Sequence, residues 1–241
     1  MSANSLTVAT WNTEWRRAVS ADARLVRERL LALSPDIICL TEAYAELLSG
    51  DGHCITSETD YGYPITPGRR KVVLWSREPW DEVDSEGHRD MPPGRFVAGR
   101  TSTPAGDLRV VGVCIPWREA HVRSGRRDRQ CWEDHLAHLA GLETLAHDWT
   151  GPTIVLGDFN QRVPRGPAPA HVYVALEGAL LERFAIATAG ALQPLGRPAI
   201  DHVVHSGDFE AVEVTALSNL AEDGRRISDH FGVSVRLIAR R

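Results

Sequence analysis

Acidic and amide side chains stand at the ends of apolar segments at five places in this 241-residue chain. The clearest is Ile154–Pro164, IVLGDFNQRVP, in which a hydrophobic run leads directly into Asp158 and Asn160. The segments VATWNTEW, IICLTEAYAE, AIDHVVHS and ISDHFGVSV add, in order, Asn12, Glu42, Asp201 and the pair Asp229 and His230. One such residue usually only bonds its own turn. Five segments that each carry, at one end, a residue able to act as an acid, a base or a metal ligand together indicate a single cleft.

The chemistry of this residue set predicts a divalent-metal site. Carboxylates gathered in one cleft are stable only when something cationic lies among them. The set offers mainly oxygen ligands, no cysteine and little histidine, which favours Mg²⁺ or Mn²⁺ over zinc. The chain has no G-x-S-x-G elbow, Walker loop or HExxH motif, so an unrelated α/β hydrolytic enzyme is poorly supported.

Nine short, β-branched segments bounded by turn residues predict the strands that would position these side chains. They are Leu6–Thr10, Asp36–Thr41, Lys71–Trp75, Phe96–Thr101, Leu108–Ile115, Thr153–Leu156, Ile200–His205, Phe209–Ala216 and Phe231–Ile238. Some of these strands follow each other directly, whereas helices separate others. This alternation favours mixed sheets covered by helices, an α/β sandwich, over a regular (βα) barrel.

Two helices are predicted from apolar spacing. In the first, Ser20 is the expected N-cap, and Val26, Leu30 and Leu33 share one face. In the second, a core-facing stripe is formed by Trp132, Leu136, Leu139, Leu142, Leu145 and Trp149. The Pro-rich segment 164–170 is expected to be a loop.

Composition limits the classes of function. The net charge of -5 and the pI of about 6.1 give no global basic field of the kind that non-specific nucleic-acid binders carry. The four cysteines form no C-x-x-C pair. No signal-peptide pattern and no stretch of about 20 apolar residues is present. We therefore expect a cytoplasmic protein with no membrane contact, and the sequence shows no sign of an obligate protein partner.

The blocks TWNTEW, LTEAY, GDFNQ, IDHV and SDHFGV stand in the order found in the endonuclease/exonuclease/phosphatase superfamily. The chain resembles this superfamily, which includes DNase I and the abasic-site endonucleases, from Thr10 to Val233. GDFN together with a C-terminal SDH is a specific joint signal. The resemblance implies a four-layer α/β sandwich of the DNase I type, with two packed mixed β-sheets flanked by helices, in a single domain over residues 1–241.

The resemblance also implies the ligands of the metal. Glu42 is expected to be the main ligand of Mg²⁺ or Mn²⁺, because a carboxylate oxygen suits such hard cations. Asn12 is expected to bind the metal or its water as a neutral oxygen donor. Asp229 is expected to add a second carboxylate, directly or through water.

Catalytic roles follow from the same resemblance. Asp158 is expected to activate the attacking water, and Asn160 to place its amide on the phosphate. His230 is expected to contact a phosphoryl oxygen or to assist proton transfer. Asp201 would accept the other ring N–H of His230, fixing its tautomer and favouring the charged ring.

Three features next to these motifs leave alternatives open. Cys114 aligns where many superfamily members carry His or Tyr, so Trp117 or His121 could enter the site instead. Arg95 resembles a supporting arginine of the superfamily, or is a solvated residue at a strand start. The segment Arg118–Arg129, with five arginines and an expected position near the cleft, could clamp an anionic substrate or be a solvated basic loop.

The function predicted from the sequence is a divalent-metal-dependent phosphoesterase that hydrolyses a phosphate ester by metal-assisted attack of water. The expected partner is a phosphorylated substrate. DNA, RNA and a small phosphorylated molecule all stay open, because the Arg-rich segment favours nucleic acid and the acidic pI opposes it. The alternative is a non-catalytic module that binds a phosphate ligand on the same fold, and Cys114 is its only support.

Overall fold

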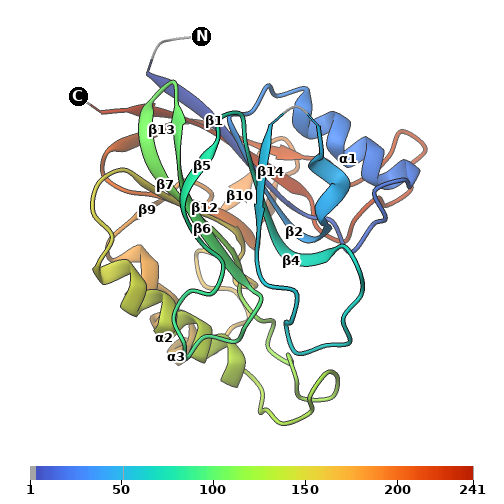
Figure 1. Cartoon of the computed structure of the whole chain (residues 1–241), viewed down its shortest axis with the longest axis vertical. Helices are drawn as coiled ribbons and strands as arrows, with labels where there is room; N and C mark the ends of the chain where they lie inside the picture. The colour runs from blue at the N-terminus through green and yellow to red at the C-terminus, as the bar shows by residue number, and fades with distance from the viewer. Residues whose placement is uncertain (1–3, 51, 241) are drawn as a thin grey trace.

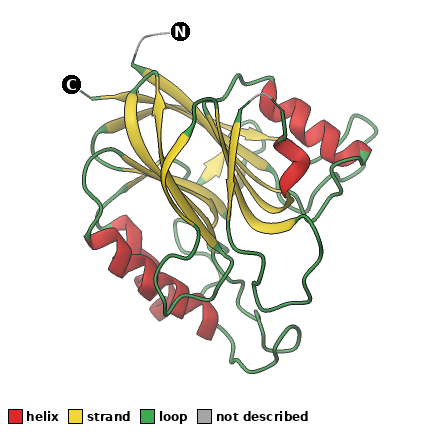
Figure 2. Ribbon diagram, viewed as in Figure 1, coloured by secondary structure: helices red, strands yellow, loops and turns green. Residues whose placement is uncertain are grey.

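Two six-stranded β-sheets packed face to face form the centre of the molecule, and helices cover both outer surfaces (Figure 1). The computed structural model describes residues 4–50 and 52–240. Figure 2 shows the same layering, with helices on opposite sides of the paired sheets. The predicted α/β sandwich is therefore confirmed.

The first sheet contains both ends of the described chain. Its strands lie in the order β13 (Phe209–Leu217), β14 (Gly232–Ala239), β1 (Ser5–Asn12), β2 (Ile37–Tyr44), β4 (Arg69–Ser76) and β3 (His53–Thr56). Strands β1 and β2 run parallel, and the other neighbours run antiparallel. Helix α1 (Ala21–Leu31) lies between the two parallel strands in sequence, because parallel neighbours need a long crossover connection.

The second sheet is built from the middle of the chain. Its strands lie in the order β5 (Trp80–Asp84), β6 (Phe96–Thr103), β7 (Gly106–Cys114), β8 (Thr153–Asp158), β12 (Asp201–His205) and β9 (Ala185–Ile186). Strands β7 and β8 run parallel, with helix α2 (Glu133–His147) between them in sequence. A separate two-stranded ribbon is formed by β10 (Ala191–Leu192) and β11 (Arg197–Pro198).

Three apolar layers hold the sheets and helices together. The largest lies between the sheets, where residues such as Val8, Leu74 and Leu156 are fully buried. Helix α1 and the 3₁₀ turn Ala45–Leu48 cover the outer face of the first sheet. The outer face of the second sheet is covered by α2, by α3 (Ala170–Leu176) and by the π-helical turn Glu177–Leu181 that continues α3. Burial of these faces drives the layering.

All nine predicted strands are present, with ends that differ by at most about three residues. Ser20 caps α1, since its hydroxyl accepts a hydrogen bond from the Ala23 amide at 3.2 Å. Val26 and Leu30 lie on the buried face of that helix, while Leu33 packs against the same layer from beyond its end.

The predicted stripe of the second helix needs a correction. Trp132 precedes α2 with a left-handed φ of 70°, so the helix begins one residue later. Leu139 and Leu142 are buried as predicted, but His135 and His138 share that buried face. The Pro-rich segment is a loop that ends where α3 begins. No helix within the described parts of the chain is both long and apolar enough to cross a membrane.

Candidate active site

Strand pairing brings the predicted site residues to one edge of the sandwich. Asp158 ends β8, and the register places it beside Cys114 of β7 and opposite Asp201 of β12. Asn12 ends β1 in the other sheet, and Glu42 lies in the adjacent strand β2. The two sheets thus contribute different members of one constellation.

The backbone around Asp158 is shaped by its neighbours. Gly157 adopts φ +136°, and a Cβ there would lie 2.0 Å from the carbonyl oxygen of Val113 in the adjacent strand. Only glycine allows this close approach. Glu42 and Asn160 take left-handed φ values of 48° and 52°, which cost free energy for residues other than glycine. Such conformations persist only where the surrounding structure holds them, and both side chains lie in the candidate site.

Asp158 is the hydrogen-bonding centre of the site. Its Oδ2 accepts bonds from the side-chain amides of Asn12 and Asn160, both at 3.0 Å, and its Oδ1 accepts the Asn160 backbone amide at 2.9 Å. Burial, with the charges of Asp201 and Glu42, raises the pKa of Asp158 to about 7. The Asn160 amide also donates to a backbone carbonyl, so both of its hydrogens are engaged and none is left for phosphate in this arrangement.

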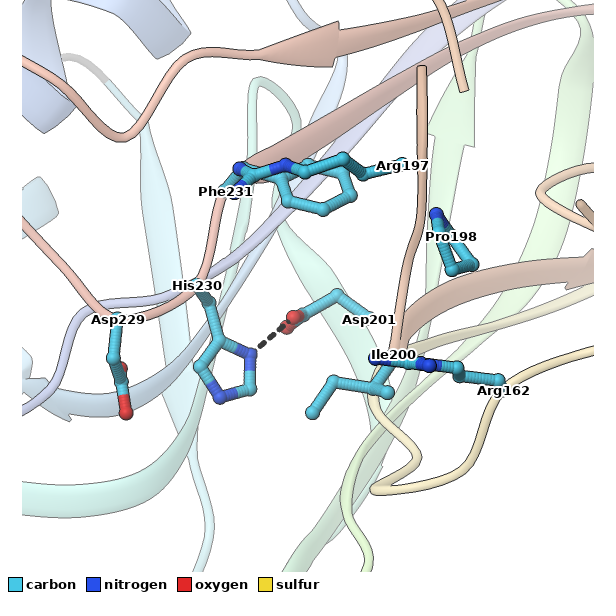
Figure 3. Close-up of a pocket in the computed structure, with 8 residues that line it drawn as sticks. All are labelled: Arg162, Arg197, Pro198, Ile200, Asp201, Asp229, His230 and Phe231. Carbon is cyan, nitrogen blue, oxygen red and sulfur yellow. Dashed lines mark hydrogen bonds and ion pairs between the residues drawn. The ribbon is translucent and has the colours of Figure 1, made fainter. Parts of the chain in front are cut away.

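His230 and Asp201 form the predicted pair. Nδ1 of His230 lies 2.5 Å from Oδ2 of Asp201, as the dashed line in Figure 3 marks. Burial alone would lower the pKa of His230, but the charge and hydrogen bond of Asp201 outweigh burial and raise the pKa to about 10. The imidazole is therefore positively charged at neutral pH. The second carboxylate oxygen of Asp201 is buried and has no hydrogen-bond partner among the described residues.

Glu42 has a partner that the sequence did not reveal. Lys71, the only lysine of the chain, places Nζ 2.6 Å from Oε1 of Glu42. The two residues lie opposite each other in the antiparallel pair β2 and β4, because the flanking residues pair as Thr41 with Val72 and Ala43 with Arg70. Burial would raise the pKa of Glu42, but the charges of Lys71 and Arg95 lower it. In the sequence RRKVVLW, Lys71 directly precedes an apolar run. This charged residue at the start of a buried run was the available signal of a role in the site, and the strand prediction did not take it into account.

The open alternatives around Cys114 and Arg95 resolve differently. Arg95 is only 1% exposed and lines the site, so a solvated arginine is excluded, and two of its guanidinium nitrogens lack hydrogen-bond partners among the described residues. Trp117 also lines the site. His121 is instead buried elsewhere against Asp134. Burial raises the pKa of the Cys114 thiol to about 12, so it is neutral.

These side chains surround a cavity of about 260 Å³, which we call the catalytic cavity. Its lining consists of Asn12, Glu42, Lys71, Arg95, Cys114, Trp117, Asp158, Asn160, Asp229 and His230. A second hollow of about 540 Å³ adjoins it on the side of Asp201 and His230, where Arg162 and Arg197 also face it (Figure 3). Asp201 lies beside His230 and lines this second hollow.

The donor set fits a hard divalent cation. Asp158 and Asp201 each offer a carboxylate oxygen, and these atoms and a ring nitrogen of His230 lie within 4.8 Å of one another. Glu42, Asn12 and Asp229 face the same cavity. The free oxygen of Asp201 and the crowded carboxylates favour a cation. A cation at Glu42 has to share that carboxylate with Lys71 or displace the ammonium group.

The Arg118–Arg129 segment lies between β7 and α2 and is largely exposed. Several of its arginines are paired with acids close in sequence: Arg118 with Glu119, and Arg126 and Arg129 with Asp134. These pairs neutralise much of the positive charge that the segment would offer to an anionic substrate.

Residues 9–230 match the family model described as the Endonuclease/Exonuclease/phosphatase family. The chain belongs to this family, as the resemblance predicted. None of the curated proteins compared with the chain matches it.

Solved structures show the same fold. An endonuclease/exonuclease/phosphatase from Beutenbergia cavernae has 19% identity and a TM-score of 0.72, with 98% of this chain and 72% of that chain covered. An AP endonuclease from Archaeoglobus fulgidus has 16% identity, a TM-score of 0.68, and coverage of 95% and 98%. The 3′ phosphatase NExo from Neisseria, bound to a product DNA hairpin, has 18% identity, a TM-score of 0.67, and coverage of 95% and 98%.

Proposed function

We propose that the protein is a divalent-metal-dependent phosphoesterase that hydrolyses a phosphate ester by attack of water. The observation that carries this proposal is the convergence of Asp158, Asp201 and His230 within 4.8 Å, beside Glu42 and the buried Arg95. Phosphate ester hydrolysis needs a positioned nucleophile and positive charge near the phosphoryl oxygens. This constellation supplies a base, fixed cations and oxygen ligands in one cavity.

Asp158 acts on the attacking water in this proposal. Hydrogen bonds from Asn12 and Asn160 fix its carboxylate, so the base is preorganised. Its pKa of about 7 suits proton transfer near neutral pH. Asn160 then acts by orienting Asp158, because its amide hydrogens are already engaged.

His230 stabilises the charge that develops on the phosphoryl group. Its Nδ1 side is held by Asp201, which leaves the opposite ring nitrogen to donate to a phosphoryl oxygen or to the leaving group (Figure 3). Arg95 adds a second buried cation at the same cavity. Fixed charges of this kind act strongly where water is excluded.

Glu42, Asn12 and Asp229 are the residues that we propose hold Mg²⁺ or Mn²⁺. When bound, such an ion supplies charge neutralisation at the phosphoryl oxygen and lowers the pKa of water. Asp158 lines the same cavity as these three residues, so its carboxylate faces the proposed site of the ion.

The substrate of the proposed reaction is a phosphorylated molecule. The Archaeoglobus protein is an AP endonuclease, and the Neisseria phosphatase was solved with a DNA hairpin. These two relatives support a nucleic acid as one candidate substrate. A small phosphorylated molecule is the other.

The test is a hydrolysis panel with Mg²⁺ or Mn²⁺, containing single- and double-stranded DNA, RNA, bis-p-nitrophenyl phosphate and several phosphomonoesters. Asp158→Asn removes the base, and we expect kcat to fall by roughly 10²- to 10⁴-fold. Glu42→Ala is expected to weaken metal dependence as well as turnover. Glu213→Ala, at an exposed ion pair on β13, is the control and should match the wild type.

The alternative, a phosphate-binding module without catalysis, predicts a different result. Folded wild type would then bind phosphate ligands and metal but show no turnover on any substrate of the panel. Asp158→Asn would leave phosphate binding largely unchanged, since that side chain would have no reaction to perform.

A further inference from the structure

A third hollow opens beside the catalytic cavity, on the side of Glu42 and Lys71. It has a volume of about 430 Å³, and we call it the aromatic pocket. Four aromatic side chains line it: Trp15, Tyr61, Tyr63 and Trp117. The two hollows share three lining residues, Glu42, Lys71 and Trp117. One ligand can therefore extend from one hollow into the other.

The aromatic side chains come from three separate parts of the chain and form an ordered group. The rings of Trp15 and Tyr61 are stacked, with centroids 5.6 Å apart and an interplanar angle of 19°. Tyr63 follows at 5.8 Å from Tyr61. Trp117 is 44% exposed, which leaves a large apolar ring open to a ligand at the border with the catalytic cavity. Contacts with neighbouring rings fix Trp15, Tyr61 and Tyr63 before any ligand arrives.

Cations set the kind of ligand that the pocket can take. Lys71 Nζ lies 5.0 Å from the Trp15 ring centroid, and the Arg69 guanidinium lies at the same distance from that ring. Lys71 is paired with Glu42, which lines the same pocket, whereas Arg69 forms no ion pair among the described residues. A quaternary ammonium group, the usual guest of an aromatic cage, would be repelled by the Arg69 charge. The aromatic rings and the positive charge beside them together favour a flat ring that is joined to a negatively charged group. The volume is within the range of small-ligand sites.

Hydroxyl groups at the rim of the aromatic pocket can form hydrogen bonds with a ligand. The Tyr63 hydroxyl lies 3.3 Å from Oγ of Ser124, and Thr66 lines the same pocket. These hydroxyls can exchange hydrogen bonds with ring nitrogens and carbonyl groups. A nucleobase presents such groups around a planar ring, and its phosphate supplies the negative charge.

We propose that the aromatic pocket binds an unpaired nucleobase of the substrate, on a nucleoside joined directly to the phosphate held in the catalytic cavity. This inference rests on the proposed phosphoesterase function and narrows its substrate to a nucleotide or a single-stranded oligonucleotide. A base inside a duplex has both faces covered by its neighbours, so it cannot stack on Trp117. Stacking of single-stranded bases on aromatic side chains tolerates any base.

The test uses dinucleoside phosphates with one cleavable linkage. Thymidylyl-thymidine is compared with two analogues in which one base, on either side of the phosphate, is replaced by hydrogen. For the wild type, we expect removal of one of the two bases to lower kcat/KM by roughly 10-fold or more. Trp117→Ala should abolish this preference, and Trp117→Phe, which keeps a ring, should retain most of it. Trp80→Ala, on the edge strand β5, is the matched control and should keep the full preference.

The inference is overturned if the wild type cleaves all three compounds equally well. It is also overturned if Trp117→Ala lowers kcat/KM by the same factor for all three, since the tryptophan would then serve the reaction and no base. Binding gives a readout that does not depend on turnover. Calorimetry with Asp158→Asn should detect adenosine 5′-monophosphate more tightly than ribose 5-phosphate, by roughly 10-fold, and Tyr63→Ala in the same background should reduce that difference.

These two readouts separate failure of the inference from failure of the proposed function. Base-dependent binding without any hydrolysis would retain the aromatic pocket and reject the phosphoesterase. Hydrolysis with equal binding of the two monophosphates would retain the enzyme and reject the pocket.

Discussion

Replacing Lys71 by methionine tests how the site balances its charges. The ammonium group lies 2.6 Å from Glu42, and the two side chains are only 9% and 24% exposed. Removing Lys71 leaves the Glu42 carboxylate among other acids without the charge that lowers its pKa most, with Arg95 and His230 as the remaining compensating charges. Breaking a buried pair in this way costs about 3 kcal/mol or somewhat more. For a chain of this length, that corresponds to a fall in Tm of roughly 6 to 12 °C.

The same substitution should change the response to metal. In the wild type, a cation that binds Glu42 has to compete with Lys71, whereas in Lys71→Met the carboxylate is free. Ligand at about 100 times its Kd stabilises a folded protein by about 2.7 kcal/mol. We therefore expect saturating Mg²⁺ or Mn²⁺ to raise the Tm of Lys71→Met by several degrees more than that of the wild type, and to restore much of the loss.

Thermal unfolding followed by circular dichroism, with EDTA or with a series of Mg²⁺ concentrations, measures both effects. Arg236→Met is the control, because Arg236 forms an exposed pair with Glu213 and should change the free energy of unfolding by less than about 1 kcal/mol. An equal Tm shift by metal in Lys71→Met and wild type would refute the competition at Glu42. A Tm of Lys71→Met equal to that of the control would refute the importance of the ion pair.

Three further predictions concern the surroundings of the site. Gly157→Ala should lower the free energy of unfolding by more than about 2 kcal/mol, because its Cβ would lie 2.0 Å from the Val113 carbonyl; a Tm within 2 °C of wild type would contradict this. Burial lowers the pKa of His202 to about 4. As the pH falls, this histidine is therefore protonated in the unfolded chain before it is protonated in the folded protein, and the free energy of unfolding should fall by about 3 kcal/mol between pH 6.5 and 4. Urea unfolding of the wild type and of His202→Gln across that range checks the sign. Cys39 and Cys114 are buried, and burial raises the pKa of both thiols, so both should resist Ellman's reagent. Native protein should therefore release two equivalents of thiolate and unfolded protein four, and a third reactive thiol before unfolding would contradict this.

The sequence predicted the strands of this fold well because most of them are buried on both faces. Strands such as β8 (Thr153–Asp158) therefore read as uninterrupted apolar runs between turn residues. Strand β5 (Trp80–Asp84) escaped prediction, since WDEVD is an exposed edge strand with no apolar period. Helix α3 was missed for a different reason: it is only seven residues long and directly follows a Pro-rich loop.

Within the site, sequence reasoning identified residues whose type alone suggests chemistry. Asp158, Asp201 and His230 do lie together, as their motifs indicated. Lys71 was not identified, because its importance arises from antiparallel pairing between β2 and β4 across 29 positions of sequence. The occupied amide of Asn160 was equally hidden, since its second acceptor is the backbone carbonyl of Ile115, just after β7. Contacts of this kind depend on register, and composition and spacing do not specify them.

The division of the site between the two sheets has a consequence for protein engineering. Asn12 and Glu42 belong to the first sheet, while Asp158 and Asp201 belong to the second. A cut in the turn between β4 and β5 would yield two fragments, and neither would contain a complete set of these groups. The β1–β14 pairing would have to re-form between the fragments before the groups could meet. With the proposed phosphoesterase activity as its readout, the fold therefore offers a split reporter that signals when two attached partners have come together.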